Sequence, residues 1–67
     1  MTIIFNNRTE NISESSISLE RLAELKNIPA RGTAIAVNGT LIPASNWSAY
    51  MLNDRDDVIV VSAAYGG

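Results

Sequence analysis

The sequence predicts a two-layer α+β domain in which one helix packs against one mixed β-sheet. Three observations lead to this fold class. Apolar residues follow helical spacing across residues 17–28, the pair Asn38-Gly39 marks a β-hairpin, and residues 58–63 are almost entirely apolar. A chain of 67 residues has room for one core, so we expect a single domain over residues 1–67.

The N-terminal residues predict a β-hairpin. Residues 2–6 contain the β-branched and aromatic side chains that are typical of a strand. Asn6 and Asn7 tolerate positive φ and favour a turn, after which residues 9–13 return as a weaker strand. Residues 13–16 are polar and rich in serine, which indicates a loop.

The next segment changes to the period of a helix. Ser18 is the predicted N-cap, and Glu20 in the first turn suits the positive end of the helix dipole. Pro29 is expected to end the helix, because its ring disfavours the α conformation of the preceding residue. The apolar stripe that we expect to pack on the sheet consists of Ile17, Leu19, Leu22, Leu25 and Ile28.

The second half of the chain predicts three more strands. Residues 33–37 and 40–42 flank the Asn38-Gly39 turn, which needs positive φ at both positions. Pro43 closes the second of these strands, because proline donates no hydrogen bond to a ladder. A 3₁₀ or irregular stretch over residues 44–51 and a turn over residues 53–57 lead to the last strand.

The predicted element order is therefore β-β-α-β-β-β. The apolar last strand belongs at the centre of the sheet, and placing it beside the first strand makes a mixed sheet of four to five strands. One helix packed on such a sheet is the β-grasp arrangement. Residues 64–67 follow the last strand as an expected flexible tail.

Composition argues against several classes of function. The net charge is −2 and no basic stripe occurs, so we expect no nucleic-acid partner. The chain has no Cys and no His, and so lacks a thiol nucleophile, the usual general base and the commonest metal ligands. There is no signal-peptide pattern and no apolar run long enough to span a bilayer. We expect a cytoplasmic protein with no membrane association and no bound cofactor.

Polar residues inside the chain offer little chemistry. Asp54, Asp56 and Asp57 are carboxylates of the kind that bind hard cations, but two are adjacent and no further ligand has suitable spacing. We interpret them as turn residues. The serines have no His base beside them, which argues against a nucleophile. We therefore predict no catalytic residue and no metal site.

The pair Gly66-Gly67 offers a different chemistry. A terminal carboxylate attacks the α-phosphate of ATP when an enzyme positions both groups. Glycine has no Cβ and accepts unusual backbone angles, so a diglycine tail can enter a narrow channel and present an unhindered acyl carbon. The dipeptide by itself is equally compatible with a frayed chain end.

Several short motifs strengthen the first interpretation, because they occur in a fixed order. They are Ile35-Ala36-Val37-Asn38-Gly39, Leu41-Ile42-Pro43, Trp47, the segment from Asp54 to Val58 that contains the acidic turn and the start of the last strand, and Gly66-Gly67. With these motifs the whole chain resembles the ubiquitin-like sulfur carrier family of thiamine biosynthesis, often called ThiS. The family pattern is a valine-asparagine turn, an apolar-proline step, a tryptophan four residues on, an acidic turn, an apolar strand and a diglycine.

The resemblance implies a sulfur carrier rather than an enzyme. An E1-like adenylating enzyme would use ATP to adenylate the Gly67 carboxylate. Sulfur from a cysteine desulfurase or related persulfide donor would displace AMP and leave a thiocarboxylate, from which thiazole synthase would take sulfur for thiamine. The resemblance implies a sulfur-carrying residue (Gly67), a tail (Gly66 and Tyr65) and a partner-docking set (Ile59, Val61, Asp54, Asp56 and Asp57).

Two residues depart from the family pattern. Tyr65 stands beside the diglycine, where small or aliphatic residues are common. Arg55 stands in the acidic turn where glycine is frequent, so this turn is expected to be strained or of another type.

Three alternatives share some of these features. The small subunit of molybdopterin synthase has the same fold and diglycine, but its relatives are usually longer and lack the Pro43-to-Trp47 pattern. A protein-modifying ubiquitin-like tag would join Gly67 to a lysine. In a plain binding module the tail would have no role.

Overall fold

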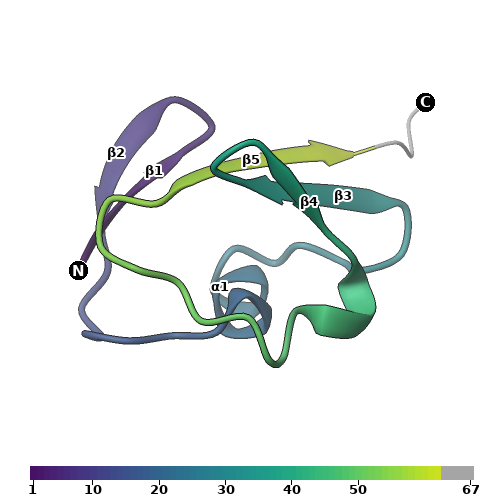
Figure 1. Cartoon of the computed structure of the whole chain (residues 1–67), viewed down its shortest axis with the longest axis horizontal. Coiled ribbons are helices and arrows are strands. Elements are labelled where there is room, and N and C mark those ends of the chain that lie inside the picture. The colour runs from purple at the N-terminus through teal and green to yellow at the C-terminus, as the bar shows by residue number, and fades with distance from the viewer. Residues whose placement is uncertain (63–67) are drawn as a thin grey trace.

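The computed structural model describes residues 1–62 and shows one α-helix on one face of a five-stranded sheet (Figure 1). The strands lie in the order β2-β1-β5-β3-β4. The predicted β-grasp fold and β-β-α-β-β-β order are confirmed. The elements are β1 (Thr2–Phe5), β2 (Arg8–Asn11), α1 (Leu19–Leu25), β3 (Thr33–Val37), β4 (Thr40–Ile42), the 3₁₀ helix η1 (Ala44–Asn46) and β5 (Asp57–Ser62).

β5 occupies the centre of the sheet, as its apolar sequence predicts. It runs parallel to β1 and antiparallel to β3, so the sheet is mixed. Val58 of β5 lies between Phe5 of β1 and Val37 of β3, and its side chain is fully buried. The strand that leads toward the diglycine is therefore hydrogen-bonded to neighbours on both sides.

Both β-hairpins turn through residues in the left-handed conformation. Asn6 and Asn7 have φ values of 49° and 69°, and Asn38 and Gly39 have values of 52° and 84°. Two successive residues with positive φ form the turn whose twist suits a two-residue hairpin. Asn and Gly adopt this conformation at the lowest cost, which is why the sequence predicts both turns correctly.

The predicted N-cap of α1 is confirmed. Ser18 Oγ accepts a hydrogen bond from the backbone N–H of Arg21 at 3.0 Å. This bond satisfies one of the donors that the first turn of a helix leaves free. Leu19, Leu22 and Ala23 are buried and form the face of the helix that packs on the sheet.

The predicted end of α1 is wrong. The last helical residue is Leu25, and Asn27 adopts a φ of 57°. The backbone N–H of Ile28 donates to the carbonyl of Ala23 at 2.8 Å, which is the hydrogen bond of a Schellman motif. The helix therefore ends through the left-handed conformation of Asn27, at a position before Pro29 in the chain. Leu25 lies outside the packed face and is 43% exposed.

The core fills the space between α1 and the sheet. Trp47, just after η1, is part of it, because the side chain is buried and Nε1 donates to the Ile42 carbonyl at 2.9 Å. This bond satisfies the one polar atom of the indole within an apolar setting. The core residues are Ile3, Ile17, Leu19, Leu22, Ala23, Ile35, Val37, Ile42, Trp47, Leu52 and Val58.

Candidate functional site

The sheet has one covered face and one open face. α1 and η1 both lie on the same side of the sheet in Figure 1. Side chains alternate between the two faces along a strand, so Ile59 and Val61 of β5 point away from the helix-covered side on which Val58 is buried. Val61 is 57% exposed, which places it on the surface.

Strand register extends this apolar surface over three strands. Ala36 of β3 pairs with Ile59 of β5 and with Leu41 of β4, so these three side chains form a row across the open face. Ala34 pairs with Val61 in the next row. Residues that pair directly lie on the same face, so the five residues form one continuous surface, called here the open-face patch. It consists of Ala34, Ala36, Leu41, Ile59 and Val61.

The resemblance seen in the sequence implied only the β5 residues of the open-face patch, Ile59 and Val61, as docking residues. Leu41 is 62% exposed, the largest exposed fraction among the exposed large hydrophobic residues of the described chain. A signal for it was present, because Leu41 lies two residues after the Asn38-Gly39 turn. That turn sets the pairing of β4 with β3 and hence the face that Leu41 occupies.

β5 is held firmly up to the point where the described chain ends. β1 stops at Phe5, and Asn6 continues the contacts with two hydrogen bonds. Its backbone N–H donates to the Val58 carbonyl at 2.9 Å, and its side-chain Oδ1 accepts from the Val60 N–H at 2.8 Å. On the other side Ser62 pairs with Thr33 of β3. Tyr65, Gly66 and Gly67, the predicted tail and sulfur-carrying residues, lie outside the described residues.

One of the three predicted docking acids faces inward. Asp56 is 6% exposed, and both of its carboxylate oxygens accept hydrogen bonds within the chain. The donors are Asn38 Nδ2 at 2.9 Å and the backbone N–H of Asn53 at 2.8 Å. Asn38 Oδ1 in turn accepts from the Asp57 N–H at 2.9 Å. Asp56 therefore joins the β3–β4 turn to the turn that precedes β5, a structural role that residue spacing did not indicate.

The two remaining acids are exposed, but they lie far from Ser62, the last described residue. Asp54 Oδ1 accepts from the Thr2 N–H at 2.7 Å, and Asp57 is the first residue of β5. Ser62 is at the other end of that strand, about 17 Å away at the usual rise per residue. The structure thus places Ile59 and Val61 beside each other toward the tail end and the acids at the opposite end of β5.

The described residues contain little that resembles an enclosed active site. An open groove of about 670 Å³ lies between α1 and η1, with Glu20 and Glu24 as its ionisable residues. No group of three or more acidic residues in the described part of the chain is arranged to hold a metal ion. No helix among residues 1–62 is long and apolar enough to cross a membrane.

Comparison with known proteins decides the family. A family model described as the ThiS family matches residues 3–67. The chain belongs to the ThiS family. The resemblance seen in the sequence is thereby confirmed over nearly the whole chain, and the motifs around Asn38, Pro43 and Trp47 lie within the matched region.

Individual relatives agree with this assignment. The chain is 27% identical over 67 residues to the sulfur carrier protein ThiS of Escherichia coli (strain K12), covering all of both chains. The crystal structure of a thiamine biosynthesis protein (ThiS) from Geobacter metallireducens is similar in fold, with a TM-score of 0.86, 22% identity and full coverage of both chains. A solution structure of a thiamine biosynthesis protein from the same organism gives a TM-score of 0.83 at 19% identity, covering all of this chain and 88% of the other.

The turn before β5 explains one departure from the ThiS pattern. Arg55 adopts a φ of 69°, the left-handed region that glycine enters most easily. Its side chain is exposed, and the nearest opposite charge is Asp54, with 3.8 Å between Arg55 Nε and Asp54 Oδ2. The turn was expected to be strained or of another type; it has the left-handed φ that glycine favours, which arginine adopts at a cost in free energy.

Proposed function

We propose that this ThiS-family chain is a sulfur carrier of thiamine biosynthesis and that it carries sulfur as a thiocarboxylate on Gly67. The observation that supports this most is the family match, which extends through Gly66 and Gly67. The relative named sulfur carrier protein ThiS is aligned over its full length with the full length of this chain. The pattern of open-face patch, firmly held β5 and diglycine is consistent with a carrier that docks by its body and reacts at its tail.

The proposed chemistry begins with a carboxylate oxygen of Gly67. This oxygen attacks the α-phosphorus of ATP on an E1-like adenylating enzyme, pyrophosphate leaves, and a mixed anhydride of carboxylate and AMP forms. The terminal sulfur of a persulfide, supplied by a cysteine desulfurase or related donor, then attacks the acyl carbon and AMP leaves. A thiolate then attacks the donor-side sulfur of the resulting acyl disulfide and forms a disulfide with the donor cysteine, and the thiocarboxylate leaves on Gly67.

Apart from the Gly67 carboxylate that reacts, we assign the chain's own residues no catalytic role in these steps. The sequence has neither His nor Cys. Among the described residues, every buried side-chain nitrogen and oxygen has a hydrogen-bond partner, so this part of the chain has no unpaired buried polar group that could act on a substrate. These properties favour a carrier whose reactions are catalysed by its partners. Thiazole synthase is the proposed acceptor of the sulfur.

The open-face patch is the proposed docking surface for the adenylating enzyme. Ile59 and Val61 present apolar area on the strand that leads to the tail, and Leu41 widens the patch across the sheet. Removing apolar side chains from water favours protein–protein association roughly in proportion to the apolar area that is buried. Asp56 takes no part in this surface because it is buried, whereas Asp54 and Asp57 would contact the partner at the edge remote from the tail.

Deletion of Gly67 tests the proposed function in the host of this protein. The gene is replaced by a version that lacks the last codon, and growth is measured without thiamine. We expect growth to require added thiamine, while circular dichroism of the purified variant remains that of the intact fold. Growth without thiamine after this deletion would overturn the proposal. Proteomic detection of lysines modified through Gly67 would favour the protein-modifier alternative.

A further inference from the structure

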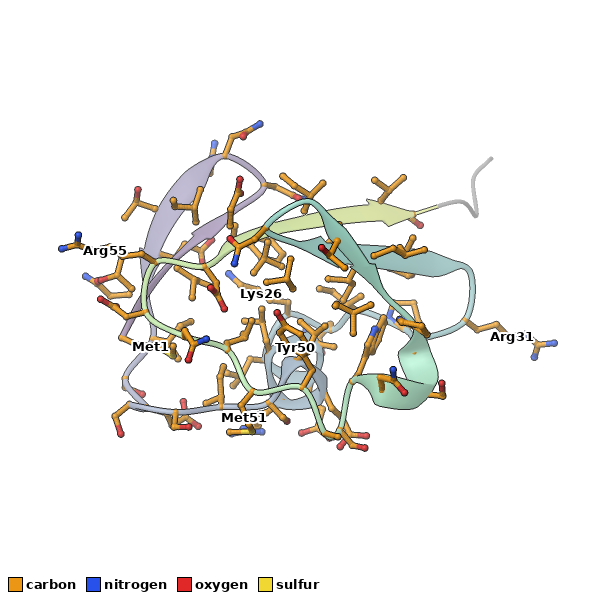
Figure 2. All side chains as sticks on the ribbon, viewed as in Figure 1. Met1, Lys26, Arg31, Tyr50, Met51 and Arg55 are labelled. Carbon is orange, nitrogen blue, oxygen red and sulfur yellow. The ribbon has the colours of Figure 1, made fainter. Side chains whose placement is uncertain are left out.

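Arg31 lies at the end of the sheet where β5 leads toward the tail. It belongs to the loop between α1 and β3, two residues before Thr33. Thr33 pairs with Ser62, the last residue of β5. Figure 2 shows the Arg31 side chain extending away from the ribbon at this end of the molecule, whereas Arg55 lies at the opposite end.

Arg31 is also a cation without an internal partner. Its side chain forms no ion pair or hydrogen bond with any residue among positions 1–62. By contrast, Lys26 pairs with Glu10. Arg21 lies 3.5 Å from Glu14 in a second ion pair. Within residues 1–62, Arg31 is therefore an unpaired positive charge at the end of the sheet where β5 ends, although the net charge of the chain is −2.

Arg31 lies at the same end of the sheet as the last row of the open-face patch. Ala34 and Val61 form the row of the patch nearest to the Thr33–Ser62 pair. Arginine is enriched among residues that dominate binding energies, and its planar guanidinium binds a carboxylate through two parallel hydrogen bonds. An arginine with no internal pair to break can form such a contact without an internal loss.

We propose that Arg31 is a docking residue that pairs with a carboxylate of the adenylating enzyme, beside the point where that enzyme receives the tail. This inference rests on the proposed function, because it names a contact of the same partner. A carboxylate of the protein is the proposed group rather than a phosphate of the nucleotide. Binding measured without ATP isolates this contact with the protein from any contact with the nucleotide.

Charge reversal with a matched control tests the proposal. Arg31→Glu is compared with Arg8→Glu, because Arg8 is also exposed and forms no ion pair within the described chain. Arg8 lies on β2 opposite Phe5, which is next to Val58 near the start of β5. The two variants have the same net charge, so they differ only in where the charge is reversed.

The affinity of each variant for the adenylating enzyme is measured by titration calorimetry, without ATP, at low and physiological salt. We expect Arg31→Glu to weaken binding about tenfold or more, and Arg8→Glu by less than about twofold. Arg31→Lys is expected to fall between wild type and Arg31→Glu, since lysine keeps the charge but loses the paired geometry. The loss for Arg31→Glu should shrink as salt increases.

Equal losses for Arg31→Glu and Arg8→Glu would overturn the proposal, because they would show a general effect of net charge. Wild-type affinity for Arg31→Glu would overturn it as well. A second readout separates this inference from the proposed function. If the wild-type chain acquires a C-terminal thiocarboxylate but Arg31→Glu binds normally, only the Arg31 contact is lost. If the wild-type chain is neither bound nor modified, the proposed function and the contact fail together.

Discussion

Replacing Asn38 by Asp changes one atom pair at the centre of a hydrogen-bond network. In the native protein Asn38 Nδ2 donates to the buried carboxylate of Asp56 at 2.9 Å, while Asn38 Oδ1 accepts from the Asp57 N–H. Asp is nearly the same size as Asn and also tolerates positive φ, so the turn itself is not expected to suffer. The substitution removes the donor and sets a second carboxylate against Asp56.

The expected destabilisation is about 3 kcal/mol. A hydrogen bond to a charged group contributes about 1.5–3 kcal/mol. Two carboxylates held at the native separation of 2.9 Å would repel by about 6 kcal/mol at an effective dielectric constant of 20. This value is an upper limit, because position 38 is exposed and the new side chain can move away from Asp56. A domain of 67 residues has a total stability of roughly 3–10 kcal/mol, so this loss is a large share of it.

Urea denaturation followed by circular dichroism measures the effect, and thermal unfolding should show a midpoint lowered by about 12 °C or more. The matched control is the exchanged pair Asn38→Asp with Asp56→Asn. In that variant the Asn at position 56 donates to the Asp at position 38, and the N–H groups of Asn53 and Asp57 keep their acceptors. We expect the exchanged pair to recover most of the lost stability. A single variant as stable as wild type, or an exchanged pair no better than the single variant, would refute this reasoning.

Three further substitutions test other parts of the structure. Val58→Asp should unfold the domain, because it buries an unpaired charge at a fully buried position. Val61→Asp, at an exposed position of the same strand, should leave the fold intact. An unchanged circular dichroism spectrum for Val58→Asp would contradict the central place of β5 in the sheet. Arg55→Gly should raise the free energy of unfolding by about 0.5–1 kcal/mol, since relief of the left-handed φ of 69° exceeds the added entropy of the unfolded chain; a lower midpoint in urea would show that the Arg55 side chain makes an unrecognised contribution. Val61→Gln should weaken binding to the adenylating enzyme by about tenfold, while Leu25→Gln, at an exposed apolar position of α1, should not; equal affinities of the two variants would place the docking surface elsewhere.

Much of the fold followed from the sequence because local signals and the overall arrangement agree. Asn38-Gly39 encodes a turn with positive φ at both residues, and Ser18 caps the helix through its own side chain. The apolar run around Val58 requires a central strand, and a central strand between two hairpins leaves few possible topologies. Each of these features depends on neighbouring residues, which is why the sequence shows them.

Two of the features that were missed depend on contacts between distant residues, whereas the end of α1 depends on a local turn. Asp56 looks like an ordinary turn acid until the fold brings Asn38 beside it. The helix was expected to run on to Pro29, yet Asn27 takes the left-handed conformation first and the Ile28 N–H closes the end. Leu41 joins Ile59 on one surface only because both pair with the same residue of β3. Residue spacing places Leu41 on one face of the β3–β4 hairpin, but it shows neither β5 beside β3 nor Asn38 beside Asp56.

Intact-protein mass spectrometry tests the central proposal most directly. The purified chain is incubated with ATP, the adenylating enzyme and a persulfide donor, and fragmentation locates any change along the chain. We expect the mass to increase by the exchange of one oxygen for sulfur, with the change at Gly67, and to stay constant when ATP is left out. An unchanged mass with a complete and active set of partners, or a change located away from Gly67, would contradict the assignment of this residue as the sulfur carrier.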